Sequence, residues 1–219
     1  MNIGEIKKSL KKVYFKYTGK IKQKKIKNKD FTIVANNCFG GIFYRNNFIE
    51  YQSPTCGLAF MAKEYIKFIY NMKHYLSIDE IEEIKMEQSK YASYLKLIQY
   101  KGVIGKIDDV EIMFLHYDTI EEAREKWNRR KKRINYNKII YKFNDQNLCT
   151  YDELKAFNDF PAKNKICFTA KKYSEFDTIQ LEQYKDNTFV LSDVNEKDYK
   201  KYFNMYKYLN ERIGENEKN

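Results

Sequence analysis

The residues best suited to chemistry follow a short apolar run that predicts a buried strand, Phe31–Ala35. They combine two amides, a thiol and two side-chain-free positions: Asn36, Asn37, Cys38, Gly40 and Gly41. Ligands of α/β proteins bind beyond the carboxyl ends of the strands, where the backbone turns back toward a helix. We therefore expect this strand end to lie in the functional site.

Cys38 is the candidate catalytic nucleophile, and His116 is its candidate base. His116 ends another predicted strand, Val110–Tyr117, and could lie beside Cys38 across the sheet. A Cys–His pair lowers the pKa of the thiol and permits covalent acyl transfer, with Asp118 or Asp145 orienting the imidazole. The alternative is a small buried cysteine that fills space under the turn, with a histidine held by structural hydrogen bonds.

The glycine pair has a second possible use in ligand binding. Backbone N–H groups at Gly40 and Gly41, at a predicted helix start, could hold a phosphate or carboxylate. A nucleotide-sugar or a lipid-linked sugar phosphate would fit such a site. A tight turn with positive φ explains the same glycines without any ligand.

Further candidate substrate-binding residues are polar and follow other predicted elements: Ser53, Thr55, Arg130, Lys142, Asn144 and Asp145. Ser53 and Thr55 either cap a helix or line the same crevice. Arg130 belongs to a cluster of basic side chains on a predicted helix, and arginine favours phosphate through bidentate contacts, although a solvated face is the simpler interpretation. Residues 142–145 end a strand and either face the ligand or form an Asx turn.

Metal and cofactor sites are not expected. The four cysteines show no C-x-x-C spacing, and the chain has only 2 His, so we interpret the cysteines as free thiols in a reducing compartment. No two Asp residues form the D-x-D pattern that a metal-dependent glycosyltransferase would need.

The elements that must position these residues alternate between strands and helices. Predicted strands are Phe31–Ala35, Lys101–Lys106, Val110–Tyr117, Lys138–Phe143, Lys165–Thr169 and Thr188–Leu191. Predicted helices are Ala62–Leu76, 78–96, Thr119–Arg133, one that starts at Thr150, and Asn195–Arg212. Thr119 and Thr150 each stand three residues before a Glu, which is the capping-box spacing. This order predicts one layered α/β domain, 31–213, whose mainly parallel mixed sheet is flanked by helices, and a frayed tail, 214–219.

The positive charge is concentrated in an N-terminal arm, residues 1–30. The chain has a net charge of +11, and this arm holds 11 Lys against Glu5 and Asp30, so the remaining 30 basic and 28 acidic residues nearly cancel. Apolar residues recur there at steps of three and four: Ile3, Ile6, Leu10, Val13, Tyr17 and Ile21. This spacing predicts a basic amphipathic helix, which either lies on an anionic membrane surface through residues 3–27 or packs its stripe on the domain.

Features that are missing from the sequence indicate which partners and which compartment to expect. It shows no nucleic-acid-binding motif, so no nucleic-acid partner is expected. It also has no apolar stretch of membrane-spanning length and no apolar signal core. We expect a cytoplasmic protein, peripheral at the inner face of the membrane if the arm binds lipid.

Several segments in a fixed order resemble the DUF1919 family, bacterial proteins often labelled exopolysaccharide or capsule biosynthesis proteins. The segments are N-N-C-F-G-G at 36–41, S-P-T-C-G-L at 53–58, F-L-H-Y at 114–117, E-E-A-R-E-K-W-N-R-R-K-K-R-I-N at 121–135, K-F-N-D at 142–145 and K-N-K-I-C-F-T at 163–169. The resemblance covers roughly residues 25–175 and supplies no catalytic residues to transfer. It implies a role in surface-polysaccharide assembly.

Three functions are consistent with these observations. The first is a transferase acting on a sugar intermediate of surface polysaccharide biosynthesis, with acyl transfer through Cys38 and His116 as one version. The second is a metal-independent glycosyltransferase. The third is a non-catalytic protein that binds a glycan or a partner of the assembly machinery at the cytoplasmic membrane face.

Overall fold

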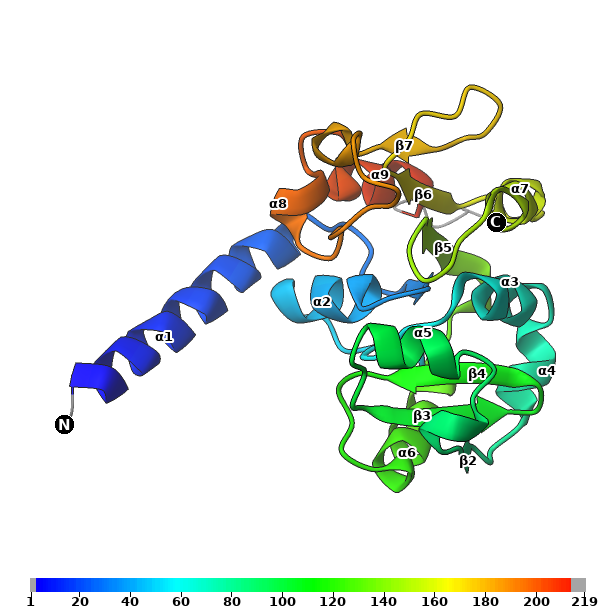
Figure 1. Ribbon diagram of the computed structural model, residues 1–219. Helices are drawn as coiled ribbons and strands as arrows, with labels where there is room; N and C mark the ends of the chain where they lie inside the picture. The colour runs from blue at the N-terminus through cyan, green and yellow to red at the C-terminus, as the bar shows by residue number, and fades with distance from the viewer. Residues whose placement is uncertain (1–2, 214–219) are drawn as a thin grey trace.

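The fold is α/β and contains two sheets, as Figure 1 shows for the computed structural model. The structure describes residues 3–213, and the expected frayed tail lies outside them. The parallel sheet has the order β1-β5-β6-β7, and its strands are Thr32–Ala35, Ile139–Asn144, Lys165–Thr169 and Ile179–Gln180. The antiparallel sheet has the order β2-β3-β4, and its strands are Glu82–Glu83, Val103–Ile107 and Val110–Phe114.

Helices flank these sheets and fill the connections between strands. The longer ones are α1 Ile3–Lys24, α2 Phe39–Asn46, α3 Ala62–Tyr70, α6 Ile120–Lys131, α7 Tyr151–Asp159 and α9 Met205–Arg212. The shorter ones are α4 Met72–Ser77, α5 Ala92–Leu97 and α8 Glu196–Tyr199, with 3-10 turns at Met86–Gln88, Tyr136–Lys138 and Glu182–Tyr184.

The parallel sheet is buried on both faces. Successive side chains of a strand point to opposite faces, and the four residues of β1 are all buried. Ile33 packs in a cluster with residues of α2 and α9, whereas Val34 packs in a second cluster with residues of α3 and α7. A strand buried on both faces explains why the sequence reads here as a continuous apolar run.

The hairpin β3–β4 belongs to a separate sheet, which corrects the expectation of a single mixed sheet. Its side chains, with Ile112 as an example, join the same apolar cluster as Val34 of β1. The segment 57–60 connects the two sheets: Ala59 exchanges backbone hydrogen bonds with Met113 of β4 (2.8 and 2.9 Å), and Phe60 N–H donates to the carbonyl of Asn36 (3.0 Å). The parallel sheet is therefore uniformly parallel, and the antiparallel pairing is confined to its neighbour.

Two predicted elements are wrong. Residues 78–96 are not one helix, because Glu82 and Glu83 pair with β3 and a helix begins only at Ala92. Residues 188–191 form no strand, and the fourth parallel strand is Ile179–Gln180.

The predicted helix 195–212 is two helices. The side chain of Asn204 accepts the backbone N–H of Lys207 and so starts α9 afresh. The predicted helix 62–76 is likewise divided into α3 and α4 at Asn71. At Asn204 this side-chain contact overrides the helical spacing of apolar residues, whereas no side-chain cap marks the break at Asn71.

The helix starts at Thr119 and Thr150 are confirmed. The side chain of Thr119 accepts the backbone N–H of Glu122 at 3.2 Å, and Thr150 and Glu153 form a complete capping box. These bonds satisfy N–H groups that a helix start otherwise leaves unpaired. The sequence signal was sufficient here because every partner lies within four residues.

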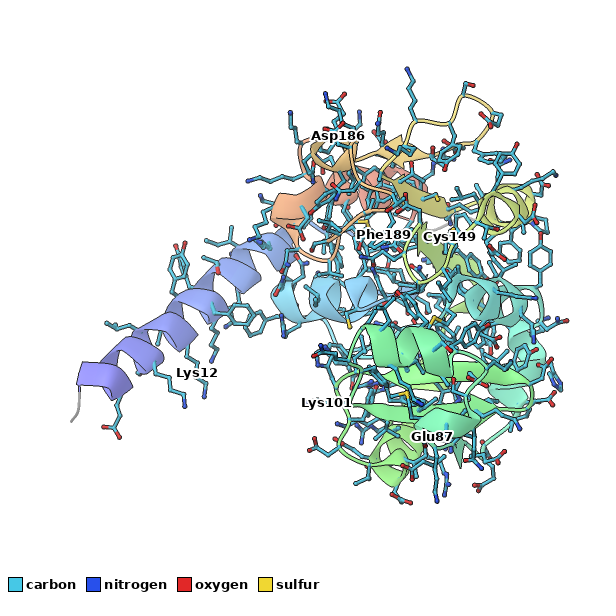
Figure 2. All side chains as sticks on the ribbon, viewed as in Figure 1. Lys12, Glu87, Lys101, Cys149, Asp186 and Phe189 are labelled. Atoms are coloured by element: carbon cyan, nitrogen blue, oxygen red, sulfur yellow. The ribbon has the colours of Figure 1, made fainter. Side chains whose placement is uncertain are left out.

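The basic amphipathic helix α1 forms and extends away from the rest of the molecule (Figure 1). Leu10, Val13 and Tyr17 of its apolar stripe are not packed on the domain, because their side chains are 64%, 63% and 67% exposed. Figure 2 shows side chains standing clear of the body along this helix, with Lys12 labelled among them. The carboxyl-terminal half of α1 contacts the rest of the molecule, through a tilted contact of the rings of Phe15 and Phe48 and an ion pair between Lys22 and Glu196.

Candidate functional site

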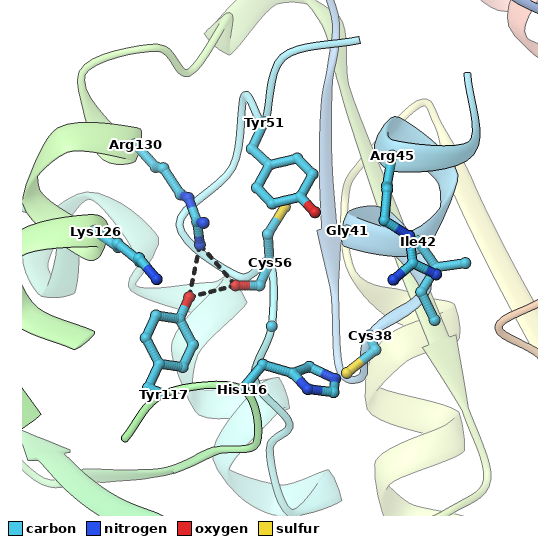
Figure 3. Close-up of a pocket in the computed structure, with 11 residues that line it drawn as sticks. Cys38, Gly41, Ile42, Arg45, Tyr51, Cys56, His116, Tyr117, Lys126 and Arg130 are labelled. Carbon is cyan, nitrogen blue, oxygen red and sulfur yellow. Dashed lines mark hydrogen bonds between the residues drawn. The ribbon is translucent and has the colours of Figure 1, made fainter. Parts of the chain in front are cut away.

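A pocket of about 510 Å³ lies between α2 and α6, beyond the end of β1 (Figure 3). One wall comes from α2 and the residue before it, with Cys38, Ile42 and Arg45. The opposite wall comes from α6 and the loop after β4, with Arg130 and His116. We call this pocket the cationic lobe, because it is lined by Arg45, Lys126 and Arg130 and, among the described residues, by no acidic side chain.

Arg130 is the most firmly held of these cations. It is buried, its guanidinium donates to the carbonyl of Cys56 (2.8 Å) and to the hydroxyl of Tyr117 (2.6 Å), and it stacks on the ring of Tyr51 at 4.8 Å. These partners are neutral, so the charge of the guanidinium is oriented but not neutralised. Burial raises the pKa of Tyr117 to about 12, and its hydroxyl therefore stays protonated beside the arginine.

The other two cations differ in their freedom. Lys126 forms an ion pair with Glu122, one turn earlier on α6. Arg45 is exposed in the last turn of α2 and has no carboxylate partner in the described part of the chain. Arg45 and Arg130 thus face the pocket with charge that a phosphate or carboxylate ligand could neutralise, and both can bind it in the bidentate manner of a guanidinium.

The structure brings His116 beside Cys38 (Figure 3). The two residues follow strands of different sheets, and the connecting segment 57–60 holds them together. The backbone N–H of His116 donates to the carbonyl of Gly57 (3.1 Å), and the Cys38 thiol contacts the carbonyl of Leu58 (3.9 Å). Gly57 has a φ of +85°, a conformation that favours glycine, and a side chain there would meet the ring of Tyr117. The turn at Gly57 therefore positions the histidine.

Cys38 is a protonated thiol at neutral pH. Burial raises the pKa of Cys38 from 9.0 to about 11, and the positive charges of Lys142 and Arg45 offset this only in part. A nucleophilic role would require the imidazole of His116 to accept the proton during attack, because no resident thiolate is available. The expected orienting carboxylate of Asp145 is already used, since it accepts the N–H groups of Ala170 and Val190 at 2.7 Å each.

The polar residues at the ends of β1 and β5 lie together and bind one another. Asn36 donates to the side chain of Asn144 at 2.8 Å, and Asn37 donates to Asp193 at 2.7 Å. The ammonium of Lys142 forms an ion pair with Asp193, and both side chains are fully buried. This cluster of Asn36, Asn37, Lys142, Asn144 and Asp193 ties the two strand ends to the loop that contains Asp193. Asn37 and Asp193 also line a second pocket, described below.

The remaining predicted residues make hydrogen bonds or packing contacts within the protein, and Gly41 also lines the cationic lobe. Ser53 and Thr55 bond to each other at 2.9 Å, and Thr55 accepts the N–H of Ala35 in β1 at 3.2 Å, so they attach their loop to the strand. Gly40 and Gly41 lie in the first turn of α2, and no positive φ is needed there. A Cβ on Gly41 would lie 3.3 Å from that of Cys56, so the glycines permit close packing of helix, strand and loop.

A second pocket, of about 360 Å³, adjoins the cationic lobe and shares Cys38, Ile42 and His116 with it. Its wall is largely aliphatic and aromatic, with Ile98, Tyr100, Met113, Leu115, Leu191 and Val194. We call it the apolar lobe. The two lobes form one crevice with the Cys38–His116 pair at their junction.

Sequence reasoning missed several residues of this crevice. Arg45 and Tyr51 carry no motif, Tyr117 ends the F-L-H-Y segment but was given no role, and Asp193 lies in a loop far from the other polar residues in sequence. A helical wheel of 39–46 could have placed Arg45 on one face with Gly41, but nothing local pairs Tyr51 with Arg130. The described residues contain no group of three His, Cys, Asp or Glu side chains arranged as a metal site.

The fold and site define an α/β protein with a cationic crevice beyond the carboxyl end of its parallel sheet. The chain belongs to the DUF1919 family, described as a domain of unknown function, whose sequence profile matches residues 9–210. It is similar to an uncharacterized protein of Haemophilus influenzae, with 25% identity over 212 residues that cover 94% of this chain and 97% of that protein. No helix among the described residues is long and apolar enough to cross a membrane.

Proposed function

We propose that this chain is a transferase that acts on a phosphorylated sugar intermediate of surface polysaccharide biosynthesis. The observation that carries the proposal is the cationic lobe, in which Arg45 and Arg130 lack carboxylate partners among the described residues. Phosphate is the group that such paired guanidinium charges recognise best. The labels often attached to DUF1919 proteins support the choice of pathway.

The reaction that we propose is glycosyl transfer without a metal. His116 accepts the proton of an acceptor hydroxyl, whose oxygen forms a bond to the anomeric carbon of the sugar. The bond from that carbon to the phosphate oxygen breaks, and the phosphate leaves with the electron pair. Arg45 and Arg130 stabilise the negative charge that develops on this leaving group.

Acyl transfer is the second candidate, because the ring of His116 lies beside the Cys38 sulfur (Figure 3). Here the thiol attacks an acyl carbonyl, His116 takes the thiol proton, and the donor's leaving group departs as a thioester forms. An acceptor hydroxyl of the sugar then displaces the thiol. The high pKa of Cys38 makes the histidine indispensable to this route.

Substitutions at the two residues separate these functions in a strain that makes its surface polysaccharide with this chain. We expect His116→Ala to lower the rate of polymer formation by at least about a hundredfold, and Cys38→Ala to leave most of it. Loss in both variants would favour acyl transfer, and full synthesis in both would favour a non-catalytic binding protein. His74→Ala is the matched control, because His74 is exposed and pairs with Asp108, away from the crevice.

The helix α1 supports a place for this reaction at the inner face of the membrane. Its exposed apolar stripe and lysines fit an anionic lipid surface, to which each lysine contributes roughly 1 kcal/mol. Phe48, which packs on α1, follows the helix that carries Arg45. We infer that binding through α1 holds the crevice close to lipid-linked intermediates.

A further inference from the structure

The apolar lobe contains exposed aliphatic side chains that no other part of the described chain covers. Ile98, Leu115 and Leu191 are 45%, 39% and 55% exposed, and they come from three separate loops that meet at this pocket. Large apolar side chains that gather at one concave site mark a binding surface more often than scattered single ones do.

The polar side chains of the same lobe are already satisfied within the protein. Gln146 donates to the carbonyls of Val190 (2.7 Å) and Leu191 (3.1 Å), and its oxygen accepts from Asn144 at 2.9 Å. Asn147 donates to the carbonyl of Phe60 at 2.9 Å, and Asp193 is held by the buried cluster. A ligand in this lobe therefore meets mainly hydrocarbon.

The aliphatic and aromatic wall of the apolar lobe disfavours binding of a sugar ring or a nucleoside base. Such groups carry donors and acceptors, and burying these unpaired costs about 1–3 kcal/mol each. A hydrocarbon chain has no such penalty and gains about 0.8 kcal/mol for each CH₂ that it buries. The neighbouring cationic lobe begins at Cys38 and His116, which line both lobes, so one molecule can occupy both at once.

We propose that the crevice binds a lipid phosphate, with its phosphate in the cationic lobe and the first part of its hydrocarbon chain in the apolar lobe. This inference rests on the proposed function, because it takes the cationic lobe as the phosphate site. It narrows the phosphorylated sugar to a lipid-linked one. His116, at the junction of the lobes, then lies next to the phosphate, where transfer takes place.

Two alkyl phosphates of different chain length test the proposal on the full chain. Methyl phosphate and decyl phosphate are titrated by calorimetry in the absence of detergent, with decyl phosphate kept below its micelle concentration. We expect decyl phosphate to bind at least about tenfold more tightly, which needs burial of only about two CH₂ groups.

Three variants assign this difference to the two lobes. Leu115→Gln should lower the affinity for decyl phosphate several-fold and leave that for methyl phosphate unchanged. Arg45→Gln should lower both affinities. Leu97→Gln is the matched control, because Leu97 is 78% exposed and lines neither lobe. Adsorption of decyl chains to α1 would be unaffected by Leu115→Gln. A weaker binding of decyl phosphate by that variant therefore reports on the crevice and not on α1.

The outcomes separate the two proposals. If methyl phosphate binds through Arg45 but decyl phosphate binds no more tightly, the lipid inference is overturned and the phosphate site stands. An equal response of Leu115→Gln and Leu97→Gln also overturns the lipid inference. If neither phosphate binds, or Arg45→Gln has no effect on either, the proposed function and the inference both fail.

Discussion

At the scale of single residues, the ion pair of Lys142 and Asp193 places two charges inside the protein. Both side chains are fully buried, and burial lowers the pKa of Lys142 while the charge of Asp193 opposes that shift. The rings of Phe39 and Phe168 lie 5.4 and 5.9 Å from the ammonium group. The pair fixes the loop around Asp193 on the carboxyl end of β5 and so closes the base of the apolar lobe.

Removing one partner of this ion pair should lower the free energy of unfolding more than replacing both partners by apolar residues. Asp193→Asn leaves the ammonium of Lys142 buried without its counter-charge, and we expect the free energy of unfolding to fall by about 3–5 kcal/mol. The double variant Lys142→Met with Asp193→Leu should recover most of this loss, because no charge is then buried. Urea unfolding measures both. Equal stability of the wild type and Asp193→Asn would show that the charge interaction is not needed.

At the scale of elements, α1 and α2 show why similar helices have different roles. The glycines of α2 let it approach β1 and the loop at Cys56 closely, so the helix is buried and forms a wall of the crevice. The lysine-rich α1 has the apolar spacing of a packed helix but leaves its stripe exposed. An exposed stripe of this kind favours an interface with another surface.

The stripe of α1 should decide binding to lipid. We expect the full chain to sediment with vesicles that contain anionic phospholipid, and more weakly with neutral ones, because lysines and apolar side chains both contribute. Replacing Leu10 and Val13 by Asp should reduce the bound fraction several-fold, whereas Leu97→Asp, an exposed change outside α1, should leave it unchanged. Equal sedimentation of both variants would exclude α1 as the lipid-binding element.

At the scale of the whole molecule, burial of thiols makes the fold sensitive to alkaline pH. Burial raises the pKa of Cys38 to about 11 and that of Cys56 to about 12, from an ordinary value of 9.0. Cys149 and Cys167 shift in the same direction for the same reason. The folded state therefore holds these protons after an unfolded chain has released them.

Because the thiol pKa values are higher in the folded state, the free energy of unfolding falls at alkaline pH. The stability that each protonated thiol contributes is fully present below pH 9.0, the pKa in the unfolded chain. It is lost as the pH rises toward the pKa of that thiol in the folded state. For Cys38 the loss is about 1.4 kcal/mol per pH unit over that window. We expect urea midpoints to fall from pH 9 toward pH 11, and to fall less steeply in Cys38→Ala. Parallel curves for the two proteins would contradict the predicted shift at Cys38.

The site was predictable from sequence wherever its partners follow from strand order. Asn36 and Asn144 meet because β1 and β5 are parallel neighbours, so their carboxyl ends coincide. His116 was expected beside Cys38 across one sheet, yet the two residues follow strands of different sheets and the segment 57–60 joins them. Asp193 and Tyr51 were not predicted, because their partners are distant in sequence and nothing local marks them.

The sequence by itself determined the local features: the apolar strands, the capped starts of α6 and α7, the basic helix α1 and the polar strand end at Asn36. Each depends on residues within a turn or two of one another. Only the tertiary structure decided that the hairpin forms its own sheet and that Lys142 is buried against Asp193. It also decided that the cationic and apolar lobes share one crevice. Those features depend on which distant segments pack together, and that choice minimises exposed apolar surface over the whole chain.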